Sequence, residues 1–302
     1  MDLVLQLLAT GLVVGSLYAL CALGWGLIYG TTLHFHVAHG AVFALAAYYA
    51  YVGQKLLHLP LLAAVAAAVL AAAATGLLID LLVYQQLEKR GAFRTSIFIS
   101  SLGLLIVLEN VLAIVFTPDP MRMDIGALGT AVIIGPVFLT YLHILTVVLA
   151  VAGYALLAAF LKWSRWGQAI RAVSSSPEMA RTVGINLGKV HLLTYAIGSA
   201  ISAPAGILVA MDVGAEPFRG TRFVLLASVG VIMGGIGSIP GARPLPGTAG
   251  EPRHLEAAVG VAVGHQLRRL PRLHPPQAAR LLRPHDPFRG DLTWRPTSRT
   301  IS

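Results

Sequence analysis

Long apolar segments recur along most of this chain, and no other feature limits its fold as strongly. A helix that crosses a membrane needs about 20 mainly apolar residues. Seven such stretches, separated by short polar loops, occur at residues 5–29, 37–57, 60–84, 95–116, 138–161, 191–211 and 223–239. Because only helices and closed barrels satisfy their backbone groups in lipid, the sequence predicts an all-α, polytopic transmembrane bundle of about seven spans.

The composition excludes a water-soluble globule. The 302 residues are 56% hydrophobic and 12% charged, with a mean hydropathy of +0.75, whereas soluble domains are about 25% charged. The net charge of +9 would ordinarily point to nucleic acid. However, residues 1–240 carry 12 basic and 9 acidic residues, and residues 241–302 carry 10 and 4. The excess belongs mainly to the tail, so we expect membrane lipid and no nucleic acid as a partner.

Basic residues cluster in two loops between the apolar stretches. One loop carries Lys89, Arg90 and Arg94, and the other carries Lys162, Arg165, Arg171, Arg181 and Lys189. Short basic loops stay on the cytoplasmic side of a membrane, and the two spans between these loops allow both to lie there. Segment 117–136 has one basic and two acidic residues. We therefore expect it outside, which also places the N-terminus outside.

Glycines recur at the four-residue spacing that lets membrane helices approach closely. The pairs are Gly11 and Gly15, Gly26 and Gly30, and Gly230 and Gly234. Either they mark helix contacts, or they meet the spacing by chance because glycine is frequent in membrane helices.

The sequence lacks the residue patterns of the enzyme classes we tested. A phosphate-binding G-x-x-x-x-G-K-[ST] loop is missing, because Gly188-Lys189 is followed by Val190 and has no glycine five residues upstream. The patterns H-E-x-x-H, G-x-S-x-G and C-x-x-C are missing too. We therefore expect no enzymatic activity, ATP hydrolysis included.

Three closely spaced histidines, His34, His36 and His39, raise the question of a metal site. Their spacings do not bring all three to one face of a helix, and no cysteine or nearby carboxylate completes a ligand set. We therefore expect no metal, and favour packing or a role at the entry of the next helix. The one cysteine, Cys21, excludes an internal disulfide.

Two acidic residues lie within predicted spans, where a charge is costly and usually functional. Glu109 should face the bundle interior or an aqueous path. There it either hydrogen-bonds a neighbouring helix or contacts a solute. Asp80 is near the end of its span, so a solvated helix terminus is the simpler expectation.

The long basic loop contains the start and stop signals of a short helix. Ser176 suits the N-cap, Pro177 the first position, Glu178 the positive end of the helix, and Gly184 the stop. We expect a short amphipathic helix between two spans. It either fits a groove on a partner protein or rests on the lipid surface.

Over about residues 10–242 the chain resembles the inner-membrane permeases of branched-chain amino acid ABC importers. The resemblance is carried by residues 15–20 (GSLYAL), 35–40 (FHVAHG), 100–103 (SSLG), 171–186 and 234–242 (GGIGSIPGA). The family usually has N-F-A-H-G where this chain has His36-Val37-Ala38-His39-Gly40, so two positions differ and the Ala-His-Gly core is kept. Singly each match is weak, and together they are specific.

The resemblance implies half of an importer, a multi-pass protein of the bacterial inner membrane. Family members pair with a second permease subunit, two cytoplasmic ATP-binding subunits and a periplasmic substrate-binding protein, so the chain itself needs no cofactor. The loop at about 163–190 looks like the family's coupling helix. The residues implied to contact an ATPase are Pro177, Glu178, Met179, Ala180, Gly184, Ile185 and Asn186. For the translocation path we consider His39, Gly40 and Glu109.

The substrate is less well defined, because the binding protein of such importers supplies most of the discrimination. The resemblance favours branched-chain amino acids as the substrate, and urea, short amides and other small polar metabolites are alternatives. Two further interpretations stay open. The chain could insert without transporting, because its last helix is missing, or it could be a stand-alone secondary carrier or channel.

The tail at 243–302 departs from the family, which would continue into a last membrane helix. It contains 10 arginines and 9 of the 17 prolines, with no apolar run of 18 residues. Its composition is typical of disorder. Either it is a genuine basic tail that binds anionic lipid or nucleic acid, or a frameshift in a GC-rich gene has replaced leucine, phenylalanine and isoleucine with arginine, proline and histidine. We favour the frameshift and divide the chain into a permease domain, 1–242, and this tail.

The frameshift interpretation predicts a single inserted or deleted base between codons 238 and 260. Sequencing the gene there, and translating the shifted frame, should restore an apolar span after Pro240-Gly241-Ala242. A confirmed reading frame, with a peptide from the Arg- and Pro-rich tail found by mass spectrometry, would contradict it.

Overall fold

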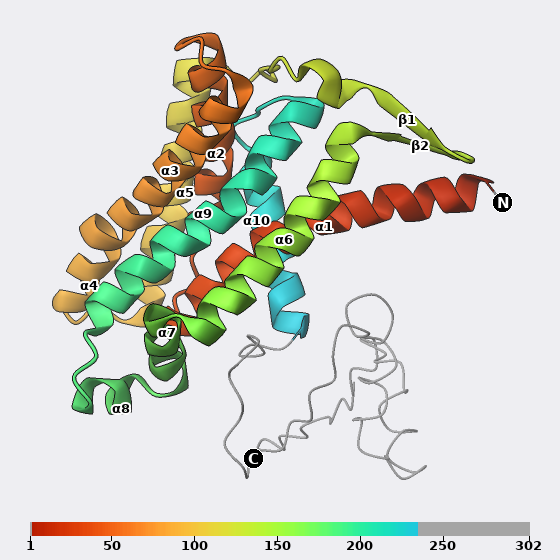
Figure 1. Cartoon of the computed structure of the whole chain (residues 1–302). Coiled ribbons are helices and arrows are strands. Elements are labelled where there is room, and N and C mark those ends of the chain that lie inside the picture. Colours follow the sequence, from red (N-terminus) through yellow and green to blue (C-terminus); the bar gives the residue numbers. More distant parts are fainter. Residues whose placement is uncertain (1, 235–302) are drawn as a thin grey trace, which may run out of the picture. The chain divides into compact units, whose positions relative to one another are not determined.

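The computed structural model describes residues 2–234, which fold mainly into helices joined by short loops (Figure 1). The predicted disorder of the tail and the end of the seventh predicted span lie outside these residues. The α-helices are α1 (Asp2–Thr32), α2 (His39–Lys55), α3 (Leu61–Ile79), α4 (Gln85–Lys89), α5 (Arg94–Phe116), α6 (Tyr141–Trp163), α7 (Arg165–Ser175), α8 (Pro177–Thr182), α9 (Leu187–Val213) and α10 (Arg219–Gly234).

Over the residues that the structure describes, each predicted span overlaps a helix. Five of the described helical segments are long and apolar enough to cross a membrane, namely Val4–Thr32, Leu61–Lys89, Arg94–Phe116, Tyr141–Trp163 and Leu187–Val213. Helix α2 has 17 residues, and α10 has 16. The all-α transmembrane bundle is thus confirmed, and the count of seven stays a prediction.

Helix α9 is the most buried of the five spans. In its most apolar stretch 61% of the residues lie inside the bundle, against 33% or less in the other four. It contacts α1, α2, α3, α6 and α7. The outer helices keep large apolar side chains exposed, as Leu62 and Ile114 illustrate at 84% and 82%, which suits surfaces that face lipid.

Glycines let α9 approach its neighbours closely. Gly198 meets Gly24 of α1, so a Cβ at Gly198 would lie 2.7 Å from the Gly24 carbonyl oxygen. A Cβ at Gly76 of α3 would lie 2.8 Å from the Tyr195 carbonyl oxygen. Gly206 packs directly against the Phe43 backbone of α2. Real Cβ contacts are longer than these distances, so a side chain at any of the three positions would push the helices apart.

The glycines that the four-residue spacing singled out do not make these contacts. Among residues 2–234, a Cβ at Gly11, Gly15 or Gly230 would have no neighbour within 4 Å, and one at Gly26 would meet only the Val231 side chain, at 3.3 Å. Within the described residues no helix packs against Gly11, Gly15 or Gly230, which favours the alternative that these three glycines meet the spacing by chance. The spacing defines a helix face, but it does not say whether another helix covers that face.

A two-stranded antiparallel hairpin lies at one end of the bundle (Figure 1). Its strands, β1 (Ala131–Ile134) and β2 (Val137–Thr140), follow the 3-10 turn η2 (Gly126–Gly129) and pair Ala131 with Thr140. Gly135 in the turn has φ +60°, which favours glycine. The predicted start of a span at residue 138 is therefore wrong, because β-branched and aromatic residues there extend as a strand.

The N-terminal half of α1 lies at this hairpin end. The Gln6 amide donates to the Phe138 carbonyl at 3.1 Å and accepts from the Phe138 N–H at 2.8 Å. Gln54, near the end of α2, makes the same pair of bonds with the Asp124 backbone. The structure thus groups the N-terminal end of α1 with the hairpin, whose first strand lies in segment 117–136, and this agrees with the predicted shared side of that segment and the N-terminus.

The two basic loops meet at the opposite end, where α4, α7 and α8 lie (Figure 1). The Gln85 amide of α4 donates to the Gly188 carbonyl of α9 at 3.2 Å. The prediction that both loops share one side is confirmed. Their assignment to the cytoplasm still rests on the charge of the loops.

Replacing Gly24 by valine should destabilise the bundle, because the new side chain would collide with the backbone of α9. We expect a loss of about 1–3 kcal/mol or more in the free energy of unfolding. Gly15→Val on the same helix meets open space and should change the value by less than about 0.5 kcal/mol. Denaturation of both purified variants in detergent, followed by circular dichroism, measures the difference. Equal effects would contradict the close α1–α9 contact.

Candidate functional site

Helix α8 begins where its sequence predicts. The Ser176 hydroxyl accepts a hydrogen bond from the Met179 N–H at 3.4 Å, and Pro177 occupies the first turn. Proline fits there because no N–H is needed at that position. Glu178 lies in the same turn, where the helix dipole favours a negative charge. The predicted N-cap and first turn are confirmed.

Helix α8 also ends at the predicted residue. Gly184 has φ +86°, a conformation that favours glycine. Its N–H donates to the Arg181 carbonyl, and the Ile185 N–H donates to the Ala180 carbonyl, each at 3.0 Å. These two bonds form the Schellman motif that closes a helix. A further helix, α7, which was not predicted, precedes it directly, and Ser176 is both the C-cap of α7 and the N-cap of α8.

Helix α7 fastens this segment to the bundle. The Ser164 hydroxyl accepts from the Gly167 N–H at 2.8 Å, which caps α7 directly after α6. Gly167 itself packs against the Phe160 and Leu161 backbone. The Ser174 hydroxyl donates to the Gly30 carbonyl of α1 at 2.5 Å. The segment therefore cannot shift without moving the ends of α1 and α6.

An apolar cluster continues this attachment. It joins Ile170 and Val173 of α7 and Ala180 of α8 to residues from three spans, namely Leu27, Leu157, Leu161 and Val190. All seven are buried. A force on α8 would consequently reach α1, α6 and α9 through packed side chains.

The opposite side of α8 faces away from the bundle. Met179 is 68% exposed and Val183, one turn on, is 74% exposed. Pro177, Glu178 and Gly184 beside them are also exposed. We call these five residues the outer face of α8. Two large apolar side chains are thus left uncovered by the described residues at the basic end of the bundle.

The remaining predicted coupling residues serve the fold. Ala180 is buried and Ile185 packs against the apolar cluster. The Asn186 side-chain oxygen accepts from the Lys189 N–H at 3.1 Å and so caps α9. Four of the seven predicted residues thus face outward, and three hold the segment in place.

Two of the predicted path residues meet at the first turn of α10. A Cβ at Gly40 would lie 2.8 Å from the Gly220 carbonyl oxygen, so close packing accounts for this glycine. Glu109 is 6% exposed, and its Oε1 accepts a hydrogen bond from the Thr221 hydroxyl at 2.6 Å. The carboxylate lies beside the positive end of α10, which favours a negative charge. The structural hydrogen bond considered for Glu109 is present.

His39 points to a different neighbourhood. It is the first residue of α2, fully buried, and its ring centre lies 5.5 Å from that of His36. Neither of its ring nitrogens has a hydrogen-bond partner among the described residues. His36 Nδ1 lies 2.8 Å from the Tyr84 hydroxyl. A role of His39 in the path remains a prediction, whereas its place at the entry of α2 agrees with the structural alternative.

Sequence reasoning missed a polar contact that ties three segments together near the basic end. His34 Nε2 lies 3.2 Å, and His191 Nδ1 3.7 Å, from Glu88 Oε1. Within residues 2–234 no group of three His, Cys, Asp or Glu is placed to hold a metal ion. The partners are far apart in sequence, so no local spacing could have revealed the contact.

The expectation for Asp80 is wrong. Its side chain is 1% exposed and accepts a hydrogen bond from the Gln85 amide at 2.7 Å. It begins the π-helical turn η1 (Asp80–Tyr84), after which the helix runs on to Lys89. Because the helix does not end at residue 84, Asp80 lies inside the bundle rather than at a solvated terminus.

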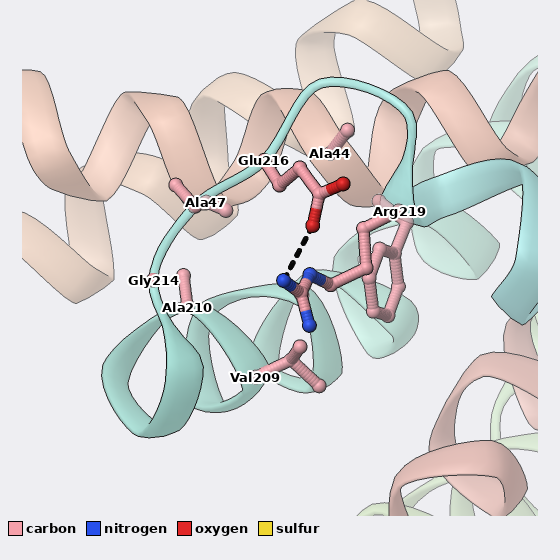
Figure 2. Close-up of a pocket in the computed structure, with 10 residues that line it drawn as sticks. Ala44, Ala47, Val209, Ala210, Gly214, Glu216 and Arg219 are labelled. Atoms are coloured by element: carbon pink, nitrogen blue, oxygen red, sulfur yellow. Dashed lines mark hydrogen bonds and ion pairs between the residues drawn. The ribbon is translucent and has the colours of Figure 1, made fainter. Parts of the chain in front are cut away.

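A second missed feature is an ion pair between α9 and α10. Arg219 Nη2 lies 2.5 Å from Glu216 Oε2, and the two side chains are 26% and 38% exposed. Figure 2 shows them facing each other beneath the 214–218 loop, with Ala44, Ala47 and Val209 around them. Both residues lie in the short connection between the predicted spans 191–211 and 223–239. No motif in that connection indicates an ion pair.

Comparison with known proteins agrees with the helical arrangement. The family model described as "Branched-chain amino acid transport system / permease component" matches residues 7–244. The chain belongs to this family. No solved structure matches it.

Several curated permeases are similar along most of their length. The branched-chain amino acid permease protein BraD of Pseudomonas aeruginosa is 35% identical over 253 residues, which cover 79% of this chain and 81% of the relative. LivH of Escherichia coli K12 is 30% identical over the same shares of both chains. The ribose import permease protein RbsC of Escherichia coli K12 is 32% identical over 101 residues, or 32% of each chain.

Membership of this family confirms several predictions. The relatives are transport permeases and not enzymes. Together with the apolar helices they place the chain in a bacterial inner membrane as a multi-pass protein. The short motifs indicated a resemblance over about residues 10–242. The family match at residues 7–244 confirms it.

Removing the Glu109–Thr221 contact should weaken the packing of α10. We expect Thr221→Val to lower the free energy of unfolding by about 1–3 kcal/mol, because the buried carboxylate loses its donor. In Glu109→Gln the amide oxygen still accepts the bond, so the loss should be smaller. Urea denaturation of both single variants and the double variant gives the coupling energy, and additive effects would show that the contact contributes nothing.

Proposed function

We propose that this chain is a permease subunit of an ABC importer and that the outer face of α8 binds an ATP-binding subunit. The carrying observation is the pair of exposed apolar side chains, Met179 and Val183, at the basic end of the bundle. A short helix with two apolar side chains one turn apart is suited to a groove on a partner. The positive-inside rule favours the cytoplasm for that end.

The attachment of α8 supports this role. Force applied at Met179 would pass through Ala180 and the α7 cluster to α1, α6 and α9. Helix α9 then runs the full length of the bundle to Val213. A rigid short helix packed on three spans is what a motor protein needs in order to tilt those spans against the others.

The remaining partners follow from this assignment. The chain has no phosphate-binding loop, so ATP is bound and hydrolysed by two partner subunits and the permease carries no cofactor of its own. A second permease subunit completes the path, and a periplasmic binding protein delivers the solute at the hairpin end.

We propose branched-chain amino acids as the solute. The printed names of BraD and LivH state branched-chain amino acid transport. The shorter similarity to a ribose import permease makes another small polar solute the alternative.

We also propose the domain boundary at residue 242. The family match ends at residue 244, within two residues of the point where the sequence changes to an Arg- and Pro-rich tail. Residues 1–242 would form the permease domain, and the coupling loop would occupy about 163–190 within it. Two alternatives remain to be separated by experiment. The chain could insert without transporting, or it could be a carrier that works without an ATPase.

Two matched glycines test the coupling role. Gly184 and Gly91 both have positive φ, +86° and +68°, and a Cβ at either would meet nothing within 4 Å. Alanine at each position costs a similar backbone strain of about 1–2 kcal/mol, but only Gly184 belongs to the outer face of α8. We expect Gly184→Ala and Glu178→Lys to insert normally and to reduce ATP-dependent uptake of L-leucine, whereas Gly91→Ala should transport like the unmodified chain.

Uptake into vesicles that contain the complete importer, with and without ATP, gives the answer. Membrane insertion is checked by immunoblotting of the membrane fraction. Uptake that continues without ATP would reject the ABC importer in favour of a carrier. No uptake by the unmodified chain would support the non-transporting product.

A further inference from the structure

The β1–β2 hairpin and the turn before it carry no charge. Residues 125–140 contain no Asp, Glu, Lys or Arg, whereas the preceding loop, 117–124, contains two acidic residues and one basic residue. Ile133 and Phe138 are cross-strand partners and therefore share one face of the hairpin. They are 65% and 61% exposed. A connection between two spans thus presents an apolar face where a loop in water would be polar.

Helix α6 fixes the depth of the hairpin in the membrane. Its first residue, Tyr141, and its last, Trp163, are 52% and 73% exposed, and such aromatic side chains gather at the two membrane interfaces. The 23 residues of α6 span about 34 Å, slightly more than the hydrocarbon core of about 30 Å. Because Thr140 ends β2 and also caps α6, the hairpin starts at one membrane interface without a linker.

Helix α1 holds the hairpin at a second point. The hairpin extends from the start of α6 toward the N-terminus of α1 (Figure 1). Gln6 binds both the N–H and the carbonyl of Phe138, and it follows the charged Asp2 by four residues, or about 6 Å of helix. Both attachments therefore lie within about one turn of the polar end of a span, which places the hairpin along the membrane surface.

The backbone of the hairpin limits how deeply it can lie. Because Phe138 directs its N–H and carbonyl to Gln6, its partner Ile133 directs its own to the opposite edge. There they have no hydrogen-bond partner among residues 2–234. Open strand edges do not occur within the hydrocarbon core, because no water reaches them there. The hairpin is therefore suited to the head-group region, where its edge meets water and its apolar side chains meet acyl chains.

We propose that the β1–β2 hairpin is an interfacial lipid anchor, which lies in the head-group region of one leaflet with Ile133 and Phe138 in contact with acyl chains. Through Gln6 the anchor holds the N-terminal half of α1 at the same depth. The partner is the lipid surface itself. This inference goes beyond the proposed importer function and does not depend on it.

The lack of charge favours lipid over a soluble partner protein. Interfaces between separately folded proteins have a polar rim, and electrostatic steering of a partner needs charges, which residues 125–140 do not have. The charged residues next to the hairpin lie in loop 117–124 instead. The apolar face also continues along the chain into the lipid-suited surface of α6, where Val148 and Val151 are 56% and 65% exposed.

Spin labels report lipid contact directly. The one cysteine, Cys21, is fully buried, so Ile133→Cys and Phe138→Cys can be labelled selectively in the full chain reconstituted in phosphatidylcholine vesicles. Power saturation compares collisions with oxygen, which concentrates in lipid, and with a nickel chelate, which stays in water. We expect the oxygen-to-nickel ratio at both positions to be severalfold higher than at Asp119→Cys in the neighbouring loop, and to approach the ratio at Val151→Cys on α6.

A charged substitution tests whether the apolar face holds the hairpin in lipid. Ile133→Glu lies directly opposite Phe138, and it should lower the oxygen-to-nickel ratio of a label at position 138 severalfold, because a carboxylate remains with water. Ile133→Val keeps the apolar face and is the matched control, in which the ratio should stay the same. A label at position 151 should be unaffected by either substitution.

The other results would overturn the inference. Ratios at positions 133 and 138 that equal the ratio at position 119 would show that the hairpin lies in water. Few collisions with either reagent would show that protein, rather than lipid, covers the face. An unchanged ratio at position 138 in Ile133→Glu would show that the apolar face does not hold the hairpin. None of these readouts involves ATP-driven uptake, so they are independent of the test of the importer function.

Discussion

The close packing of α9 against α1, α2 and α3 is the contact on which the rest of the bundle depends. In lipid, helices gain little from burying apolar surface, so their association relies on shape and on backbones that come close. Gly24, Gly198 and Gly206 provide that closeness. The arrangement fixes α9 in the interior and leaves the surrounding helices with apolar faces that suit lipid.

Helix α9 also connects the end of the bundle where α8 lies with the hairpin end. At its start, Asn186 caps the helix directly after α8, and Val190 packs into the α7–α8 cluster. At its end, Val213 leads into the loop that carries Glu216 and Arg219. A push on the outer face of α8 would thus be transmitted along one buried helix to the 214–218 loop.

Local chemistry in the sequence was enough for some features and not for others. The ends of α8 follow from Ser176, Pro177 and Gly184, because caps act within one turn. The spans follow from apolar length, which the bilayer imposes. The Glu88 contacts, the π-turn at Asp80 and the buried position of the 214–218 loop depend on neighbours far away in sequence. The glycine contacts could not be predicted for the same reason. Whether a glycine lies at a close helix contact depends on which helix packs against it, and a four-residue spacing within one helix does not show this.

The central claim is that α8 is a cytoplasmic helix that a separate ATPase moves, and a cysteine at Met179 tests it most directly. Because Cys21 is fully buried, Met179→Cys would be the one accessible thiol among the described residues. The account predicts a crosslink from it to a co-expressed ATP-binding subunit and protection from impermeant thiol reagents added outside the cell. Leu62→Cys, 84% exposed at the start of α3, should give no such crosslink. Labelling of Cys at position 179 from outside, or no crosslink to any ATP-binding subunit, would contradict the account.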